Sequence, residues 1–121
     1  MAVPDGNLRR DGRGGADVLD GRNGIDTASY AGSNVGVDVN LSIRYANFGD
    51  ATGDRLISIE NLSGSYFGDT LIGDAGANVL SGQNGNDWLG GAGGADQIIG
   101  GAGVDTASYA GSTTGVDVNL A

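Results

Sequence analysis

Residues 64–108 read GSYFGDTLI, GDAGANVLS, GQNGNDWLG, GAGGADQII and GGAGVDTAS when they are divided into lines of nine. Every line begins with glycine, carries Asp or Asn in its sixth place, and has an apolar residue in its eighth place. A strict repeat with a short fixed period is typical of a solenoid, in which each repeat stacks on its neighbours. The sixth-place residues are Asp69, Asn78, Asp87, Asp96 and Asp105.

This nonapeptide pattern predicts one turn and one short strand in each line. Glycine permits the positive φ angles and the close backbone approach that a tight turn requires, and the eighth place supplies one inward apolar side chain per strand. Two lines then make one flattened coil, so line n and line n+2 stack on the same side and pair in parallel. We therefore predict an all-β fold, a parallel β-roll or β-solenoid of glycine-rich nonapeptide repeats with one irregular insertion.

The same nonapeptide occurs twice more near the start of the chain. The two lines are GRGGADVLD (12–20) and GRNGIDTAS (21–29), and they place Asp17 and Asp26 in the sixth position. The repeat therefore begins well before the regular stretch at residue 64.

Between these two groups of lines the period is interrupted. Val37 follows Ala28 by nine residues, which predicts that the register continues for one more strand. Residues 43–54 lose the period and are expected to form a loop that bulges from the solenoid. Residues 55–63 are read as one further line without glycine, with Glu60 in the sixth place. The predicted inward column from there on is Leu62, Leu71, Leu80, Leu89, Ile98, Ala107 and Val116.

Side chains in the insertion have ordinary structural explanations. Tyr45 and Phe48 are expected to fold back over an exposed edge of the core. Asp50 and Asp54 could form a local cation site, but Gly, Asp and Thr at such spacing are also common turn residues, and the turn is favoured.

We predict one roll over residues 12–121, preceded by a short segment with no periodicity. Residues 1–11 are expected to be an unstructured leader or an expression remnant. The blocks of the predicted roll are a first block (12–42), an inserted loop (43–54) and a main block (55–121).

A longer repeat lies over the short one. Residues 12–41 match residues 91–120 at a constant offset of 79, and both copies contain TASYAGS and GVDVNL. We therefore expect a fragment of a longer array, or a short natural array. Tyr30 and Tyr109 each follow shortly after an inward alanine, so each ring is expected to fill the space beside it.

Composition excludes several classes of function. The chain has no Cys and no His, which removes disulfides, thiol nucleophiles, zinc sites and imidazole bases together. It also has no Lys, so the aspartates have no partner that could tune them for catalysis, and we predict that the chain is not an enzyme. No run of about 18 apolar residues is present, so no membrane span is expected.

Charge points to a cation as the partner. The net charge is −9, and residues 56–121 contain seven carboxylates but no basic residue. Such a surface repels nucleic acid, so no nucleic-acid partner is expected. A hard cation is favoured instead.

Stacking makes the sixth-place carboxylates decisive. Side chains of lines n and n+2 lie on strands about 4.8 Å apart, so like charges there oppose folding unless a divalent ion bridges them. A shell of carboxylate and turn-carbonyl oxygens suits Ca²⁺ better than Mg²⁺ or a transition metal. We predict that the chain is disordered without Ca²⁺ and folds when it binds the ion. The two predicted columns are Asp69, Asp87 and Asp105 on one edge, and Glu60, Asn78 and Asp96 on the other.

The lines GQNGNDWLG, GAGGADQII and GGAGVDTAS resemble the GGxGxDxUx nonapeptide of the repeats-in-toxin (RTX) family. The resemblance implies a calcium-binding parallel β-roll. In that family Ca²⁺ lies between the turns of lines n and n+2, held by sixth-place side chains and turn carbonyls. This implies sites at Asp69 with Asp87, at Asp87 with Asp105 and, with reduced charge, at Asn78 with Asp96.

Other matching positions fit the motif less well. Glu60 has a longer arm and no glycine in its turn, which puts a site between Glu60 and Asn78 in doubt. Asp17 and Asp26 match the motif but have no evident partner two lines further on, so each would bind a terminal ion or complete a site with a neighbouring molecule. The turn residues expected to contribute carbonyl ligands are Gly82, Asn84, Gly91, Gly93, Gly100 and Ala102.

The resemblance also implies a location and a context. Proteins of the family are secreted by type I systems, stay unfolded at low cytoplasmic Ca²⁺ and fold outside the cell. The expected role is a structural, secretion-linked module of a larger secreted protein. One alternative is a Ca²⁺-dependent adhesive module that stacks end to end through its open strand edges. Another is an accessory domain of a secreted hydrolase, lyase or epimerase.

Overall fold

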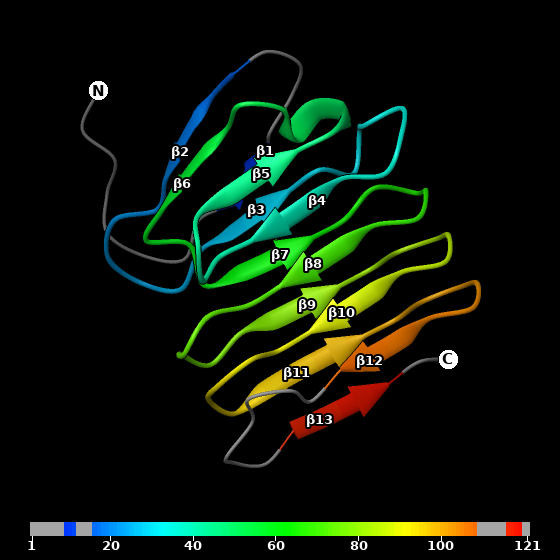
Figure 1. Ribbon diagram of the computed structural model, residues 1–121. Coiled ribbons are helices and arrows are strands. Elements are labelled where there is room, and N and C mark those ends of the chain that lie inside the picture. Colours follow the sequence, from blue (N-terminus) through cyan, green and yellow to red (C-terminus); the bar gives the residue numbers. More distant parts are fainter. Residues whose placement is uncertain (1–8, 12–15, 109–115, 120–121) are drawn as a thin grey trace.

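A computed structural model of the protein describes residues 9–11, 16–108 and 116–119. In these residues the chain forms thirteen strands of three or four residues and one short 3-10 helix, stacked along one axis (Figure 1). The described residues contain no helix with the length and apolar character needed to cross a membrane. The elements are β1 (Arg9–Asp11), β2 (Val18–Asp20), β3 (Thr27–Ser29), β4 (Asp38–Asn40), β5 (Tyr45–Asn47), η1 (Gly49–Ala51), β6 (Arg55–Ile57), β7 (Asn61–Ser63), β8 (Thr70–Ile72), β9 (Val79–Ser81), β10 (Trp88–Gly90), β11 (Asp96–Ile99), β12 (Thr106–Ser108) and β13 (Val116–Asn119).

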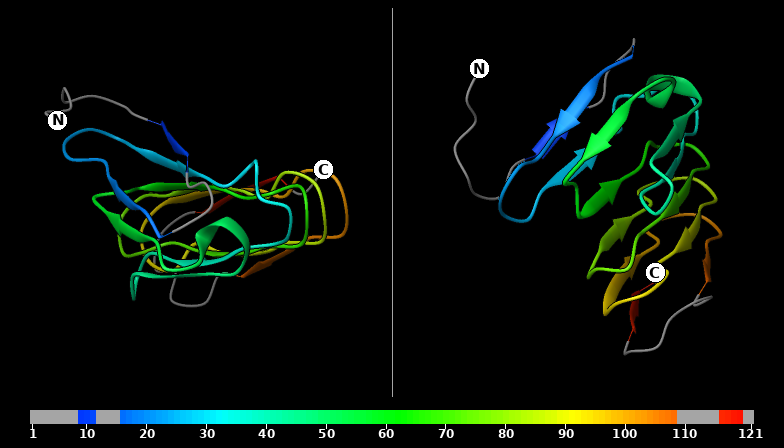
Figure 2. Two further views of the ribbon diagram at one scale, coloured as in Figure 1. Left: turned by 90° about the horizontal axis from the view of Figure 1, so that it is seen from above. Right: turned by 60° about the vertical axis from the view of Figure 1, so that its left-hand side comes forward.

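From β7 onward the strands alternate between two sheets, as the nonapeptide predicts. One sheet has the order β1-β3-β7-β9-β11-β13, and the other has the order β12-β10-β8-β4-β5. The pairings are parallel except between β4 and β5. Seen from above, the coils from β7 to β12 lie over one another as a flattened ring, whereas the first strands lie outside it (Figure 2, left). The prediction of a parallel β-roll is confirmed.

Eighth-place side chains fill the space between the two sheets. Leu71 pairs with Leu89 on one sheet, and Leu80 pairs with Ile98 on the other. Each of these four side chains is fully buried. Each of these four strands therefore contributes one main apolar side chain to a narrow core.

Positive φ angles occur at the turn positions of the three lines between residues 82 and 108. Gly85, in the fourth place, has φ 98°, and Gln83, in the second place, has φ 69°. Lines 64–72 and 73–81, which are described in full, contain no residue with positive φ. The chain thus uses two kinds of turn, although the strands on either side of them are alike.

The register around β4 differs from the prediction. Val39, not Val37, pairs with Leu71, so Val39 occupies the eighth place and Val37 the sixth. Both side chains are buried, because residues two apart in a strand face the same side, and the alternating pattern fitted either register. The same shift recurs at the other end of the stack, where Val118 rather than Val116 pairs with Ile98.

The segment after β4 also differs from the loop that the sequence predicts. A tight turn over residues 41–44 reverses the chain, so β5 pairs antiparallel with β4. The chain then runs back to the first coil, where β6 pairs with β2 (Figure 1). Residues 55–63 therefore hold two strands, β6 and β7, rather than one line of nine. The inserted segment therefore joins the stack through the pairing of β5 with β4 and leads into β6, which pairs with β2.

Some side chains at the N-terminal end of the stack lie where the sequence predicts, and others do not. Tyr30 is fully buried, as expected, whereas Tyr109 lies outside the described residues. Tyr45 and Phe48 were expected to cover the core but remain exposed, and Ala51 is buried there instead. Residues 9–11, which the sequence assigns to an unstructured leader, form β1 and pair with β3.

Substitution of Gly85 by alanine is expected to destabilise the calcium-loaded roll by about 1–3 kcal/mol. Its φ of 98° disfavours any side chain, and an added Cβ would lie 2.5 Å from the carbonyl carbon of Phe67 in the preceding coil. Urea unfolding in excess Ca²⁺ measures the effect. Gly32→Ala is the matched control, because no atom lies within 4 Å of its Cβ position, and equal loss in both variants would contradict the assignment.

Candidate metal centres

Sixth-place carboxylates form a column along one edge of the stack. The backbone N–H of Asp69 donates to Oδ1 of Asp87 at 2.9 Å, and the N–H of Asp87 donates to Oδ1 of Asp105 at 3.0 Å. The N–H of Val37 donates to Oδ1 of Asp69 at 2.8 Å. Each carboxylate thus uses one oxygen to fasten its own coil to the preceding coil.

The opposite edge carries a second column with one more member than the sequence suggested. The N–H of Asn78 donates to Oδ1 of Asp96 at 2.9 Å. The N–H of Asp26 donates to Oε1 of Glu60 at 2.8 Å, across 34 residues instead of the 18 that separate Asp69 from Asp87. Asp26 therefore has a column partner that the sequence did not indicate, because the insertion lengthens the chain between the two coils.

Asp17 also has a partner that the sequence missed. Its N–H donates to Oδ1 of Asp54 at 2.7 Å, and β2 and β6 pair directly after these two residues. Asp54 is buried and was expected to be a turn residue. A signal for its role was present, because Asp54 stands two residues before the inward Leu56, with the same spacing as Asp17 and Leu19.

The other carboxylate oxygen of several sixth-place aspartates is buried without a partner. Such atoms are Oδ2 of Asp17, Asp69, Asp87, Asp96 and Asp105, none of which makes a hydrogen bond in the part of the chain that is described. Burial of an uncompensated carboxylate oxygen is costly, so each of these atoms calls for a cation or a proton.

First-place glycines leave the room beside these oxygens. A Cβ added at Gly64, Gly82, Gly91 or Gly100 would overlap Oδ2 of the aspartate five residues later in the same line. None of these four glycines has a positive φ, so they are required for space and not for backbone conformation.

Backbone carbonyls line the same spaces. The carbonyl oxygen of Gly82 lies 3.2 Å from the Cβ position of Gly64, and that of Gly100 lies 2.9 Å from the Cβ position of Gly82. Oδ2 of Asp69 and the Gly82 carbonyl therefore border one space, and Oδ2 of Asp87 and the Gly100 carbonyl border the next. Two of the predicted carbonyl ligands are placed beside the predicted carboxylates.

Asn78 stands apart from the carboxylates of its column. Its Oδ1 accepts from the N–H of Asp74 at 3.0 Å, and its Nδ2 donates to the carbonyl oxygen of Glu60 at 2.6 Å and to Oδ1 of Asp74 at 3.1 Å. Gly73 begins the line that contains Asn78, and the carbonyl oxygen of Gly91, two lines further on, lies 2.8 Å from the Cβ position of Gly73. The predicted pairing with Asp96 is present, but the amide of Asn78 is already hydrogen-bonded within the protein.

The third-place residues of these turns, which are Asn84, Gly93 and Ala102, remain predicted carbonyl ligands. A Cβ on Gly93 would lie 3.4 Å from Cα of Ala75, so this turn stacks at ordinary contact distance on the turn two lines earlier. Among the described residues no group of three or more carboxylates gathers at one point. An ion here would take one or two carboxylates and complete its shell from backbone carbonyls. An all-oxygen shell of this kind fits Ca²⁺.

Burial raises the pKa values of the column carboxylates. The pKa of Asp87 rises from its usual 3.8 to about 7, because the carboxyl group is buried and because Asp69 and Asp105 lie next to it in the column. Burial is also the main cause that raises the pKa of Asp69, Asp96 and Glu60. Burial therefore disfavours bare negative charge on these four carboxylates.

Comparison with known families agrees with this geometry. The family model described as RTX calcium-binding nonapeptide repeat (4 copies) matches residues 11–28, 63–98 and 72–107, which together span just over half of the chain. No curated protein matches the chain.

Gly82→Ala is expected to weaken Ca²⁺ binding at the Asp87 turn by at least about tenfold, which corresponds to about 1.4 kcal/mol. The added Cβ takes the space beside Oδ2 of Asp87, and the backbone of Gly82 needs no positive φ. Calorimetric Ca²⁺ titration measures the change. Gly93→Ala keeps its carbonyl and meets only ordinary contacts, so an equal loss in that control would contradict the role of the Gly82 space.

Acid is expected to stabilise the calcium-free roll. A folded-state pKa of about 7 for Asp87, above its usual 3.8, gives stability that is complete below about pH 4 and is lost as the pH rises through 7. Urea unfolding in chelator should therefore give a higher free energy of unfolding at pH 5 than at pH 8.

The opposite trend is expected in excess Ca²⁺, because the ion requires deprotonated carboxylates. Asp87→Asn is the control variant, and its pH dependence in chelator should be weaker than that of the natural chain. A free energy of unfolding in chelator that stays constant or rises between pH 5 and pH 8 would overturn the prediction.

Proposed function

This chain belongs to the family of RTX calcium-binding nonapeptide repeats, and from that premise we propose that it is a module of a larger secreted protein that completes its folding on Ca²⁺ outside the cell. The chain is a calcium-binding β-roll. The observation that carries the proposal is the set of buried, unpartnered Oδ2 atoms beside first-place glycines.

Asp69, Asp87, Asp96 and Asp105 are the residues that would hold the ions, with the carbonyls of Gly82 and Gly100 beside the first two. Bound Ca²⁺ supplies positive charge between successive coils. The Oδ1 atoms keep their bonds to backbone N–H groups, so the carboxylates are already oriented by the stack. The surroundings of Asp87 support the same proposal, because burial and the neighbouring carboxylates of Asp69 and Asp105 disfavour uncompensated charge there and raise its pKa.

The proposed location follows from family membership together with calcium chemistry. Cytoplasmic Ca²⁺ is too low to fill sites of modest affinity, whereas extracellular modules bind it with dissociation constants on the order of 10⁻⁴–10⁻³ M. Such a chain would stay incompletely folded before export and become ordered afterwards. We propose export by a type I system, as the family resemblance implies.

We propose a structural role, with any catalysis located elsewhere in the parent protein. The chain has no His, Cys or Lys, and carboxylates such as those of Asp87 and Asp96 accept backbone N–H groups within the two columns. The natural alternative is end-to-end assembly, because β12 and β13 stand at the open edges of the two large sheets. Such edges pair readily with another chain.

Calcium titration of the full chain tests both ideas together. Far-UV circular dichroism should show an increase in β-structure between chelator and millimolar Ca²⁺, because the ion removes the repulsion within the columns. Light scattering on the same samples should give the mass of a monomer throughout. A β spectrum that does not respond to Ca²⁺ would refute the proposed folding function, and a mass that grows with Ca²⁺ would favour the assembling module.

A further inference from the structure

We propose that residues 26–81, here called the inner block, hold their coils together without calcium, through protein groups that replace the ion. Ca²⁺ is then needed to add residues 82–108, here called the outer block. The inference rests on the proposed function, because it divides the calcium response of one stack between two parts.

Tyr30 replaces a cation at Asp54. Oδ1 of Asp54 accepts the N–H of Asp17, as in the other carboxylate positions, but its Oδ2 accepts the hydroxyl of Tyr30 at 2.9 Å. Both Tyr30 and Asp54 are buried. The oxygen that is left without a partner at Asp87 and Asp105 therefore has a donor from the protein here.

Asn78 replaces a cation between Glu60 and Asp74. Its side-chain amide donates two hydrogen bonds, one to the Glu60 carbonyl oxygen and one to the Asp74 carboxylate. A neutral donor in this place removes one negative charge from the column and also satisfies two acceptors. The coil that contains Asn78 is thus joined to the preceding coil by groups that are present at any Ca²⁺ concentration.

The turn before Asp69 is closed in a similar way. Ser65 Oγ donates to Oδ1 of Asp69 at 2.7 Å and accepts the N–H of Phe67 at 3.0 Å. In the next line, Oδ1 of Asp74 accepts the N–H of Gly76. These side-chain bonds stand in turns that have no positive φ, whereas the turns of the outer block contain residues with positive φ, such as Gln83 and Gly85. In the coil before Asp69, the sixth place is the buried, uncharged Val37.

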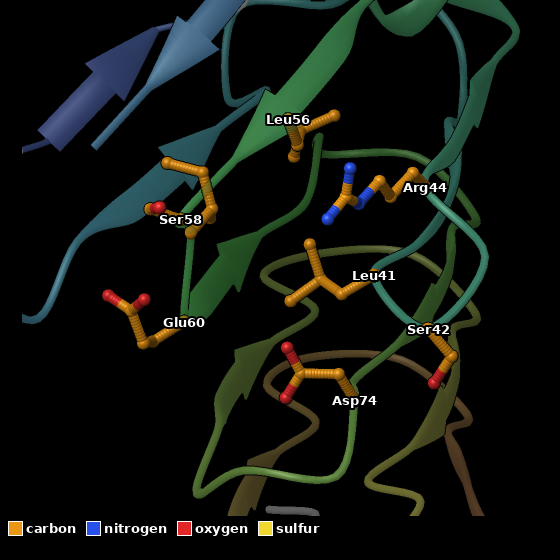
Figure 3. Close-up of a pocket in the computed structure, with 8 residues that line it drawn as sticks. Leu41, Ser42, Arg44, Leu56, Ser58, Glu60 and Asp74 are labelled. Carbon is orange, nitrogen blue, oxygen red and sulfur yellow. The ribbon is translucent and has the colours of Figure 1, made fainter. Parts of the chain in front are cut away.

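An arginine adds positive charge to the same block. Arg44 lines a pocket of about 380 Å³ whose lining also includes Glu60 and Asp74, and its side chain lies between Leu56 and Leu41 (Figure 3). One arginine and two acidic residues of the inner block therefore line the same pocket. Every basic residue of the chain lies at or before position 55, so the outer block has no cation of its own.

The apolar core is divided in the same way. Of the fourteen buried hydrophobic residues in the described part of the chain, eleven lie in the inner block, and the other three are Leu19, Leu89 and Ile98. Each large apolar side chain stabilises the fold when it is buried. The outer block therefore depends on its turns, and these contain Asp87, Asp96 and Asp105 with unpartnered Oδ2 atoms.

Asp69 lies at the boundary between the two blocks. Its Oδ1 is bonded within the inner block, to Val37 and Ser65, while its Oδ2 faces the Gly82 carbonyl of the outer block. The first calcium that the stack requires is thus the one that docks the outer block onto the inner block.

Hydrogen exchange of the full chain, measured by mass spectrometry in chelator and in millimolar Ca²⁺, tests this division. In chelator, amides of β3, β4, β7 and β8 should keep their protection, whereas amides of β10, β11 and β12 should exchange freely. Ca²⁺ should then protect the outer block. Loss of protection throughout the chain in chelator, restored by Ca²⁺, would overturn the inference and leave the proposed function intact. Full protection of both blocks in chelator would overturn both.

Two variants test the groups that replace the ion. Tyr30→Phe removes the donor to Asp54, and the opening equilibrium of the inner block in chelator should rise about 10- to 100-fold. Tyr66→Phe makes the same chemical change at a side chain that is 57% exposed, and should change nothing. Equal effects of the two substitutions would overturn the role of Tyr30.

Asn78→Asp restores a carboxylate to the column and removes its donor. The inner block of this variant should lose protection in chelator and regain it in Ca²⁺, so that it comes to depend on the ion. Asn34→Asp adds the same charge at an exposed position of the same block and is the control. Retention of full protection by Asn78→Asp in chelator would contradict the proposal.

Discussion

The structure depends on one arrangement, a carboxylate in the sixth place of a turn that is fastened to the coil before it. Oδ1 of Asp87 accepts the N–H of Asp69, and this bond fixes the spacing and register of successive coils. The same bond leaves Oδ2 buried beside a first-place glycine. A hydrogen bond that orders the stack therefore also creates its electrostatic problem, and the turn must supply a positive group to solve it.

Because the apolar core is narrow, repulsion between the buried carboxylates has a large effect on the stability of the stack. A strand of three residues directs one main apolar side chain inward, while all nine residues of its line lose conformational freedom on folding. Leu89 and Ile98 are fully buried, yet they are the only buried apolar side chains that the structure shows between residues 82 and 108. A domain with a broad core tolerates a few unfavourable charges, but this stack has little apolar stabilisation to offset them.

Much of the fold follows from the sequence wherever the period is strict. Equal spacing from residue 64 to 108 fixes which lines stack, so the Asp69–Asp87–Asp105 column and the Asn78–Asp96 pair follow from counting. The register predicted from residue spacing was wrong where an alternating strand fitted two registers, as at Val37 and Val39. The prediction also failed where the insertion turned back along the stack, because no local pattern reports that path, and the partners of Asp17 and Asp26 depend on it.

Departures from the repeat carry as much physical meaning as the repeat itself. A donor encoded in the chain, such as the Tyr30 hydroxyl or the Asn78 amide, acts under all conditions, whereas an ion acts only where it is abundant. On the proposal above, a donor of this kind lowers the calcium sensitivity of its own coil, while the strands beside it keep the parallel pairing of the stack. Because each coil contacts mainly its neighbours, sensitivity can be assigned coil by coil. Some positions depart from the repeat and look degenerate in the sequence. On this proposal, these positions determine which coils need Ca²⁺ in order to fold.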